Sequence, residues 1–477
     1  MKTTLSTGEM PADMTDMREA LALGRTTASA LVDCAIKRAE AVNPQLNFIA
    51  WPTFERARGQ AGEPRPGPLA GIPTLIKDML PEKGIPASFG SVALRDFIAP
   101  DDAPYARAIA DAGLISIARS AMPELGLNAV TESPLHGPTR NPWNLAYTPG
   151  GSSGGGAAAV AAGVVPIAHA SDGLGSIRHA AAPCGLVGLK PSRGRNSGEE
   201  AFRSIADLTV NGCVSRTVRD SAAWLEATQT RDPACLPPIP PVTLPLDRRL
   251  RIHAYGRVMR TGKLPDASVQ RVFGDAIALL GRFGHSVVAA DLPFAGSDAM
   301  QLLGTITEGM FSRRLGMLSQ AIGIEVKVED LEHRSATLIA AGAAIGDEQF
   351  ASAWTAMEGI VAAYLDRLEQ IDIWMTPTLS TEIPRIGVFG PDISWVDQKD
   401  PLMDYAGYCW IDNFAGTPAI SLPLGFSDNG LPVGIQFAAS PGGEALLLAL
   451  AYQLETSLQW QRHTPPIWTG DCPAYDG

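Results

Sequence analysis

The sequence predicts an α/β fold in which a β-sheet is covered by helices on both faces. Helical and strand patterns alternate along the chain with no repeat period, which is typical of layered α/β proteins. The chain has 477 residues, 45% of them hydrophobic, so it can bury a large core without disulfide bonds. Its length suggests about three domains, but apolar patterning resumes on both sides of the Pro-rich run at residues 233–245. We therefore expect one large domain over residues 1–477.

The individual elements follow from local patterns, taken in chain order. Apolar residues near helical spacing predict a helix over residues 10–43, with Thr26 or Thr27 as its N-cap. Residues 56–68 are rich in Pro, Gly and Arg, which is typical of a surface loop, and the apolar residues 69–80 predict a buried strand with one lysine. The other predicted elements are a helix over 103–112, a strand over 113–118, an irregular loop over 123–147, a helix over 157–162, a strand end over 164–170, a helix over 269–283, and strands over 286–290 and 371–375.

The composition excludes several classes of protein. The 38 Lys and Arg residues against 50 Asp and Glu residues give a net charge of −12, whereas nucleic-acid binders normally carry a basic excess. The six cysteines lie far apart with no CxxC spacing, which argues against a zinc ribbon or disulfide framework and fits a reducing cytoplasm. The first residues contain no signal-peptide core, and the most apolar stretch, residues 157–170, is too short to span a bilayer. We therefore expect a cytoplasmic protein that binds neither nucleic acid nor membrane and needs no metal or other cofactor.

A glycine-rich loop, Gly-Gly-Ser-Ser-Gly-Gly-Gly at residues 150–156, leads directly into a helix-forming alanine run. A glycine loop at a helix N-terminus turns backbone N–H groups towards an approaching ligand. The GxxxxGK[ST] pattern of a phosphate loop is absent, and the loop carries hydroxyl groups instead of a lysine. A flexible linker is the alternative interpretation, but we favour a functional loop.

A second polar segment, Ser-Asp-Gly-Leu-Gly-Ser-Ile-Arg at residues 171–178, follows a short apolar stretch. A serine after a tight glycine turn presents its Oγ beside unpaired backbone N–H groups, and such groups stabilise a developing oxyanion. Asp172 and Arg178 flank the turn and are placed to clamp it as an ion pair. A plain polar turn between a strand and a helix is an equally good interpretation of this segment alone.

The third element is Lys77, which lies in the apolar sequence Ile-Pro-Thr-Leu-Ile-Lys. An ammonium group is costly to bury, so such a lysine either extends to solvent or loses its proton. No histidine stands at a spacing that indicates a Ser-His-Asp triad. If Ser176 is a nucleophile, a neutral lysine is a suitable base. Strand alternation points the adjacent Asp78 to the opposite face.

Together these three segments resemble the amidase signature family. The similarity is strongest over residues 150–192 and includes LAGIPTLIKD at residues 69–78. It implies the fold of that family, one domain with a mixed twisted sheet, with a signature core at about 69–225 and a variable substrate-pocket region at about 300–410. Shorter matching segments lie at residues 141–143, 215–222, 376–378, 416–418 and 430–434.

The resemblance implies a Ser-cisSer-Lys triad that hydrolyses an amide through an acyl-enzyme. Ser176 is the implied nucleophile, Ser152 the bridging serine, and Lys77 the base that takes the proton through it. Backbone amides of the turn are expected to hold the oxyanion. The implied oxyanion-hole residues are Gly173, Leu174 and Gly175 with the Ser176 amide, the supporting residues are Ser153, Asp172 and Arg178, and weaker candidates for substrate contact are Gly126, Gly150 and Gly151.

Two positions depart from the family's usual Thr-Asp-x-Gly-Gly-Ser turn, because Ser171 replaces threonine and Leu174 replaces glycine. Leucine tolerates positive φ poorly, so Leu174 must lie in an ordinary backbone region or under strain. We expect His169 and His179 to be hydrogen-bonded structural histidines, with a pocket-lining role as the alternative for His179. Cys184 is expected to be a core thiol.

The expected substrate is a small, fairly apolar amide. Segments 302–317 and 403–410 are rich in Met, Leu and aromatic residues, which is typical of an apolar pocket wall or of plain core, and no cluster of Arg or Lys there indicates a dicarboxylate substrate. The chain loosely resembles the subgroup that contains 6-aminohexanoate cyclic-dimer hydrolases, with aryl acylamidases and urethane-cleaving enzymes as comparable possibilities. An amidotransferase A-type subunit that releases ammonia and a non-catalytic ligand-binding protein on the same fold are the alternatives. A homodimer is compatible with each of them.

Overall fold

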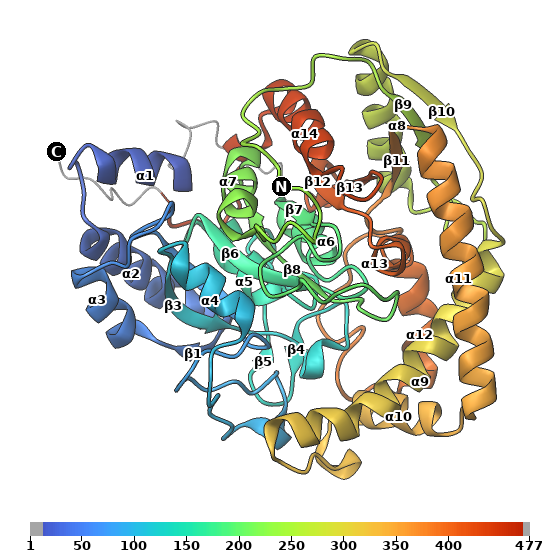
Figure 1. Ribbon diagram of the computed structural model, residues 1–477, viewed down its shortest axis with the longest axis horizontal. Helices are drawn as coiled ribbons and strands as arrows, with labels where there is room; N and C mark the ends of the chain where they lie inside the picture. Colours follow the sequence, from blue (N-terminus) through green and yellow to red (C-terminus); the bar gives the residue numbers. More distant parts are fainter. Residues whose placement is uncertain (1–12, 471–477) are drawn as a thin grey trace.

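An eight-stranded mixed β-sheet forms the core of the computed structural model, which describes residues 13–470 (Figure 1). The first three strands in spatial order pair in parallel and every other neighbouring pair is antiparallel. The predicted α/β class with a mixed sheet is therefore confirmed. In spatial order the strands are β10 (Ser286–Ala289), β9 (Arg251–Ala254), β11 (Ile373–Pro377), β13 (Pro432–Ala438), β12 (Ala419–Phe426), β7 (Val187–Lys190), β8 (Val210–Ser215) and β6 (Ile167–Asp172).

A second sheet of three strands lies against the edge strand β6. Its order is β1 (Ile49–Pro52), β3 (Ile115–Ser120) and β2 (Pro73–Lys77). Thr74 Oγ1 of β2 donates to the carbonyl of Ile167 in β6 at 2.9 Å, so the two sheets meet side by side. This junction sets the lysine at the end of β2 beside the end of β6. A two-stranded ribbon, β4 (Glu132–Ser133) with β5 (Gly137–Pro138), lies in the loop that was expected to be irregular.

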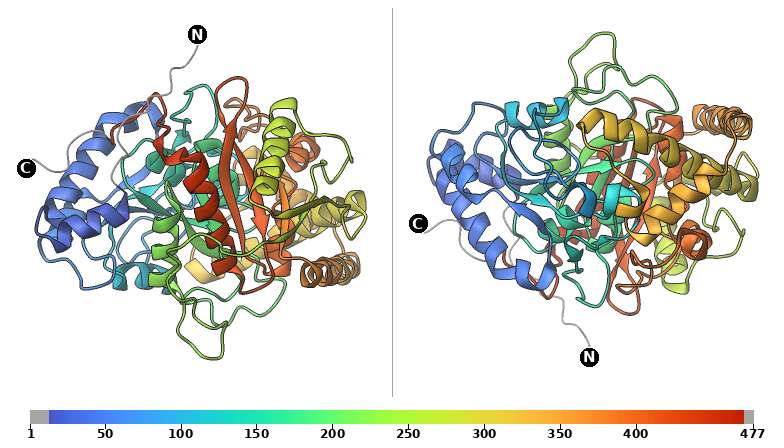
Figure 2. Two further views of the ribbon diagram at one scale, coloured as in Figure 1. Left: turned by 90° about the horizontal axis from the view of Figure 1, so that it is seen from above. Right: turned by 90° about the horizontal axis from the view of Figure 1, so that it is seen from below.

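Helices cover both faces of the large sheet (Figure 2). Alternate residues of β11 show this, because Ile373 and Met375 pack in one hydrophobic core with helices α7, α8 and α14, whereas Trp374 packs in another with α9 to α13. Their bounds and those of the other α-helices are α1 (Met14–Ala22), α2 (Ala28–Leu46), α3 (Phe54–Gly62), α4 (Pro104–Asp111), α5 (Gly154–Ala161), α6 (Arg178–Cys184), α7 (Val218–Thr228), α8 (Ala267–Arg282), α9 (Gly296–Ile322), α10 (His333–Ala343), α11 (Asp347–Gln370), α12 (Trp395–Tyr405), α13 (Trp410–Ala415) and α14 (Glu444–Leu458).

The helix expected over residues 10–43 is two helices, α1 and α2, and residues 10–12 lie outside the described part. Thr27 is the N-cap of α2, since its side chain accepts a hydrogen bond from the Ala30 amide. The surface loop expected over residues 56–68 is wrong for its first half, which belongs to α3. Ala57 and Ala61 are four residues apart and both are buried, so one face of this short helix packs despite its loop-like composition.

The helix α5 starts at Gly154, three residues before the alanine run in which the sequence predicted it. Its first glycines are required by close packing rather than by turn geometry. A Cβ on Gly154 would lie 2.3 Å from Thr131 Oγ1, and one on Gly155 would lie 2.5 Å from the Ala121 backbone. No helix within residues 13–470 is long and apolar enough to cross a membrane.

Candidate active site

Lys77 ends strand β2 and is completely buried. The adjoining strand β6 fixes its backbone, because the Lys77 amide donates to Nδ1 of His169 at 3.2 Å. The other ring nitrogen of His169 lies 3.1 Å from Asn211 Oδ1, and burial lowers the pKa of His169 to about 3. His169 is therefore a neutral structural histidine, as predicted, and it sets the position from which the lysine side chain extends.

Three serine hydroxyls surround the Lys77 amine. Its Nζ lies 2.7 Å from Ser152 Oγ, 3.0 Å from Ser171 Oγ and 3.1 Å from Ser153 Oγ. Burial lowers the pKa of Lys77 from its ordinary 10.5 to about 7, and the charge of Asp172 opposes the shift only in part. A neutral amine in this position accepts one hydroxyl proton and donates to the other two oxygens.

The neighbouring carboxylate, Asp78, does not join this group. Its Oδ2 accepts a hydrogen bond from Ser88 Oγ at 2.5 Å, and its Oδ1 lies 3.7 Å from Arg119 Nε. The side chain thus turns away from Lys77, as strand alternation predicted. No acidic group between residues 13 and 470 contacts the amine directly, so burial rather than ion pairing determines its protonation.

Ser152 follows a cis peptide bond after Gly151, just before helix α5. Of the three glycines suggested as substrate contacts, Gly150 and Gly151 do not line the pocket that Ser152 lines. A Cβ on Gly150 would lie 2.1 Å from the His179 carbonyl oxygen, and one on Gly151 would lie 2.6 Å from the Val130 carbonyl oxygen. These glycines allow the loop to pack against the protein backbone, and this corrects the expectation of substrate contact.

The turn that carries Ser176 is clamped by Asp172. The Asp172 carboxylate accepts hydrogen bonds from the Gly175 amide at 2.6 Å, the Ile177 amide at 3.2 Å and Arg178 Nε at 2.9 Å. Burial alone would raise the pKa of Asp172, but the Arg178 guanidinium holds it well below its usual range. The predicted ion pair between Asp172 and Arg178 is therefore present and fully buried.

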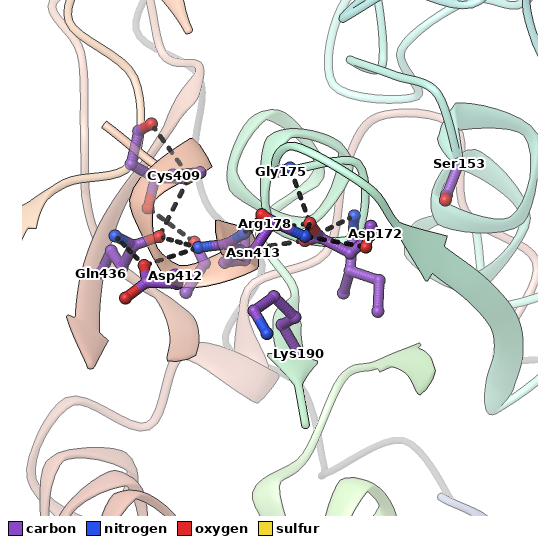
Figure 3. A network of polar contacts seen from close by, with 12 residues as sticks. Ser153, Asp172, Gly175, Arg178, Lys190, Cys409, Asp412, Asn413 and Gln436 are labelled. Carbon is purple, nitrogen blue, oxygen red and sulfur yellow. Dashed lines mark hydrogen bonds and ion pairs between the residues drawn. The ribbon is translucent and has the colours of Figure 1, made fainter. Parts of the chain in front are cut away.

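A network of distant residues holds this ion pair in place (Figure 3). Arg178 also donates to Asp412 Oδ2 and Gln436 Oε1 at 2.9 Å each, and to Asn413 Oδ1 at 2.7 Å. Sequence analysis missed these three partners. For Asp412 and Asn413 the one signal in the sequence is that they form a polar pair inside the otherwise apolar run 409–415.

The backbone of the turn differs in part from the expected oxyanion hole. The Gly175 amide is taken by Asp172, whereas the amides of Gly173, Leu174 and Ser176 have no hydrogen-bond acceptor within residues 13–470. Leu174 does not adopt positive φ, so the replacement of glycine causes no backbone strain there. Gly175 has φ +127°, and a Cβ on it would lie 2.2 Å from the His179 ring.

Ser176 is half-buried. Its Oγ makes no hydrogen bond in the part of the chain that the structure describes, so no direct bond joins it to Ser152. Both serines line one pocket of about 260 Å³, together with Gly126. A Cβ on Gly126 would lie 3.4 Å from Ser152 Oγ, which makes this glycine a close neighbour of the bridging serine.

The walls of this pocket are mostly apolar. Segment 302–317, now within α9, contributes Leu303, Met310 and Phe311, and segment 403–410 contributes Met403 and Trp410. Of the two interpretations offered for these segments, the structure favours the pocket wall over plain core. No group of three His, Cys, Asp or Glu side chains that could hold a metal ion occurs between residues 13 and 470.

His179 and Cys184 both lie on α6. The backbone of Ala406 forms the predicted hydrogen bond with the His179 ring, although Nε2 is buried without a partner. The ring also lines the pocket, which was the alternative role. Burial lowers the pKa of His179 to about 4, so the ring is neutral at physiological pH. Cys184 is a buried thiol, as predicted, and its Sγ donates to the Pro149 carbonyl at 3.5 Å.

Comparisons with known proteins agree with this geometry. The family described as Amidase matches residues 30–448. AmiC of Mycobacterium tuberculosis is 36% identical over 469 residues, which cover 95% of this chain and 96% of AmiC. The 6-aminohexanoate-cyclic-dimer hydrolase of Paenarthrobacter ureafaciens is 31% identical, with 95% of this chain and 96% of that protein covered.

Solved structures show the same fold over nearly the whole chain. The structure of a 6-aminohexanoate cyclic dimer hydrolase matches with a TM-score of 0.89 and 29% identity, covering 96% of this chain and 99% of the other. A bacterial aryl acylamidase of the amidase signature family matches with a TM-score of 0.84 and 26% identity, again over 96% and 99%. The chain therefore belongs to the amidase signature family and is an amidohydrolase that acts on non-peptide carbon–nitrogen bonds.

Proposed function

We propose that Lys77, Ser152 and Ser176 form a Ser-cisSer-Lys triad that hydrolyses a small, fairly apolar amide through an acyl-enzyme. One observation carries the proposal. The buried Lys77 amine lies 2.7 Å from Ser152 Oγ, and Ser152 lines the same pocket as the partly exposed Ser176. A pKa near 7 supports a neutral Lys77 at physiological pH, as a general base requires.

In the acylation step, Ser176 Oγ bonds to the substrate carbonyl carbon and passes its proton to Ser152. Ser152 in turn passes its own proton to neutral Lys77. The C–N bond then breaks as the proton returns from Lys77 through Ser152 to the leaving nitrogen. The amine departs and leaves the acyl group as an ester of Ser176. Water hydrolyses this ester along the same proton path.

The hydroxyls of Ser152 and Ser176 are not hydrogen-bonded to each other in this structure, and catalytic hydrogen bonds often tighten only in the substrate complex. The free amides of Gly173, Leu174 and Ser176 support an oxyanion hole for the tetrahedral intermediate. In this proposal Gly175 contributes a bend and a contact to Asp172 rather than a donor to the oxyanion. This narrows the set of oxyanion donors implied by the family resemblance.

The apolar lining supports a linear or cyclic amide, an anilide or a carbamate as substrate. Of the relatives named above, one is named for the hydrolysis of a 6-aminohexanoate cyclic dimer and another for that of aryl acylamides. Cleavage of a carbamate (urethanase activity) is a further candidate. Rates measured on a panel of one anilide, one lactam, one primary amide and one carbamate of equal acyl length identify the preferred class. A preference for small apolar amides over charged polypeptides is the expected result.

The assignment of the triad is tested by Ser176→Ala, Ser152→Ala and Lys77→Met, with the exposed Ser29→Ala as the control. Each triad variant is expected to lose at least about 10³-fold in kcat, as removal of other triad members does. A fluorophosphonate probe should label Ser176 in the wild type and fail to label the Ser176→Ala variant. Near-wild-type hydrolysis by Ser176→Ala contradicts the triad, and absence of labelling in the wild type favours a non-catalytic ligand-binding protein.

We also propose that the protein acts in the cytoplasm. Cys184, Cys213, Cys235 and Cys409 are free thiols, and three of these four are buried, which supports a reducing compartment. We also propose that two copies of the chain form a homodimer. Sedimentation equilibrium tests this, because a dimer has twice the monomer mass of 50.3 kDa. The formation of disulfides in the purified native protein would count against the cytoplasmic assignment.

A further inference from the structure

Two arginines and no carboxylate line the candidate pocket in the described part of the chain. Arg314 comes from α9 and Arg334 from α10, and Arg334 is only 1% exposed. This is unexpected in a chain with 50 acidic and 38 basic residues. The sequence shows no cluster of Arg or Lys in segments 302–317 and 403–410. Arg314 belongs to the first of these segments, but Arg334 lies outside both, so the sequence did not predict that two arginines share the pocket.

The guanidinium of Arg334 has no hydrogen-bonded partner in the described part of the chain. Its Nε and Nη1 are buried and unpaired, and no ion pair joins it to an acid within residues 13–470. Glu124 and Glu332 act on its charge from a distance, but the Glu124 oxygens already accept from Ser91 Oγ at 2.7 Å and from the Glu332 amide at 3.0 Å. The guanidinium instead lies over the Trp395 ring at 5.3 Å.

The other fully buried arginines of the structure provide an internal comparison. Arg119, Arg178 and Arg195 each form an ion pair with a buried or nearly buried carboxylate, at 2.8, 2.9 and 3.0 Å. Such pairing is the rule, because an unpaired buried charge is strongly destabilising. Among these large buried side chains, Arg334 differs both in lacking a carboxylate and in lining the pocket.

Arg334 keeps its charge at neutral pH. Burial lowers its pKa to about 10, which is still well above 7. Burial and the nearby Glu124 raise the pKa of Glu332 to about 8, so Glu332 is mostly neutral and does not balance the guanidinium. The pocket therefore contains a cation that lacks hydrogen-bond acceptors and is surrounded by apolar walls, an arrangement that an anionic oxygen group of a ligand complements.

We propose that Arg334 binds a carboxylate of the substrate, so that the preferred substrate is an amide whose apolar arm ends in a carboxylate. An N-acylated ω-amino acid and a monoamide of a dicarboxylic acid both have this form. The proposal rests on the proposed function, since it assumes that Ser176 attacks an amide in the same pocket. It narrows the substrate from any small apolar amide to one with a distal acid.

Matched substrate pairs test the preference. The first pair is the mono-anilide of adipic acid and its methyl ester, with the carboxylate on the acyl arm. The second pair is N-acetyl-6-aminohexanoate and its methyl ester, with the carboxylate on the amine arm. For at least one pair the wild type is expected to show a kcat/KM at least tenfold higher for the acid than for the ester, mainly through KM. A preference of the wild type for the ester in both pairs would overturn the proposal.

Variants then assign the preference to one residue. Arg334→Met should reduce the ratio of acid to ester from at least tenfold to about one, and Arg334→Lys should restore part of it. Arg313→Met is the control, because Arg313 pairs with the exposed Asp347 and does not line the pocket, and it should keep the wild-type ratio. A ratio that survives in Arg334→Met, or that is lost only in Arg314→Met, would refute the role of Arg334.

A binding measurement separates this proposal from the proposed function. Hexanoate and the neutral 1-hexanol are titrated calorimetrically into the Ser176→Ala variant, with and without Arg334→Met. Hexanoate should bind at least tenfold more tightly than hexanol, and only when Arg334 is present, whatever the hydrolytic activity of the wild type. If hexanoate binds no better than hexanol while the wild type hydrolyses the neutral anilide, the triad stands and the carboxylate site is disproved.

Discussion

Lys77 Nζ lies 2.7 Å from Ser152 Oγ although the two residues are 75 positions apart in the chain. The lysine ends β2, and the serine precedes α5, so the contact depends on the packing of β2 beside β6. Two further serines complete the shell around the amine. The fold therefore holds the candidate base and the bridging hydroxyl in contact before any substrate arrives, which reduces the reorganisation needed for reaction.

The first prediction concerns the pH dependence of hydrolysis. Because Lys77 has a pKa of about 7 and is proposed to act in its neutral form, kcat/KM for a neutral anilide should rise with an apparent pKa near 7. The value at pH 8 should be about tenfold that at pH 6, which follows from the fraction of neutral amine. His169 and His179 have pKa values of about 3 and 4, so they do not titrate in this range. A flat profile from pH 5 to 8, with chemistry rate-limiting, would exclude a lysine base.

The second prediction is that Lys77→Met stabilises the protein while it abolishes activity. A pKa lowered from 10.5 to about 7 corresponds to roughly 4–5 kcal/mol of lost stability at neutral pH. The loss of hydrogen bonds to three serines offsets part of this at about 1 kcal/mol each, so we expect a net gain of roughly 1–3 kcal/mol in the free energy of unfolding. Urea denaturation at pH 7 measures it, with the exposed Lys37→Met as the control.

The pH dependence of this gain has a defined sign. Between pH 7 and 10.5 the unfolded lysine is protonated and the folded one is neutral, so the wild type becomes more stable as the pH rises. The advantage of Lys77→Met should therefore shrink from pH 7 towards pH 10. An advantage that is constant over this range would mean that packing, rather than the buried amine, is responsible.

Local chemistry explains why the sequence predicted the two serines and the lysine. A lysine in an apolar strand and serines within glycine turns are unusual locally, so each was visible within a few residues of sequence. The partners that hold the Ser176 turn were not visible in this way. Asp412, Asn413 and Gln436 lie 234, 235 and 258 positions from Arg178, and only the tertiary fold brings them together.

Pocket chemistry was also beyond a local reading of the sequence. Arg334 lies on α10, in a charged stretch that gives no sign of burial. Its burial depends on contacts with α9 and α12, including the Trp395 ring. The role of Gly175 was similarly misjudged, because its amide is used by Asp172 and its missing side chain makes room for His179. A glycine in a motif reveals that space is needed but not which neighbour fills it.

The third prediction concerns the close approach of Gly175 to the His179 ring. Gly175→Ala should reduce kcat by at least about 100-fold, because φ is +127° and the new Cβ would lie 2.2 Å from the His179 ring. Gly59→Ala in α3 is the matched control, since nothing lies within 4 Å of its Cβ, and it should stabilise the protein by up to about 1 kcal/mol. The double variant Gly175→Ala/His179→Ala should recover only part of the activity, because the backbone conformation still disfavours alanine. Full activity of Gly175→Ala would show that the turn is free to rearrange.

The fourth prediction concerns the buried ion pair behind the turn. Arg178→Met leaves the carboxylates of Asp172 and Asp412 buried without their guanidinium partner, so we expect a loss of about 3–5 kcal/mol in the free energy of unfolding at pH 7. Arg58→Met, which breaks surface ion pairs with Asp33 and Glu55, should cause no measurable change. Urea denaturation of both variants gives the comparison.

Acidification should reduce this loss. In the wild type Arg178 keeps the pKa of Asp172 below its usual range, so the carboxylate stabilises the fold above pH about 4 and loses that contribution below it. Without Arg178, burial raises the pKa of Asp172 instead, and the variant gains stability as the pH falls from 7 to 5. The difference in the free energy of unfolding between wild type and Arg178→Met should therefore be smaller at pH 5 than at pH 7. A difference that does not change with pH would mean that lost packing of the long arginine side chain, and not an unpaired buried charge, destabilises the variant.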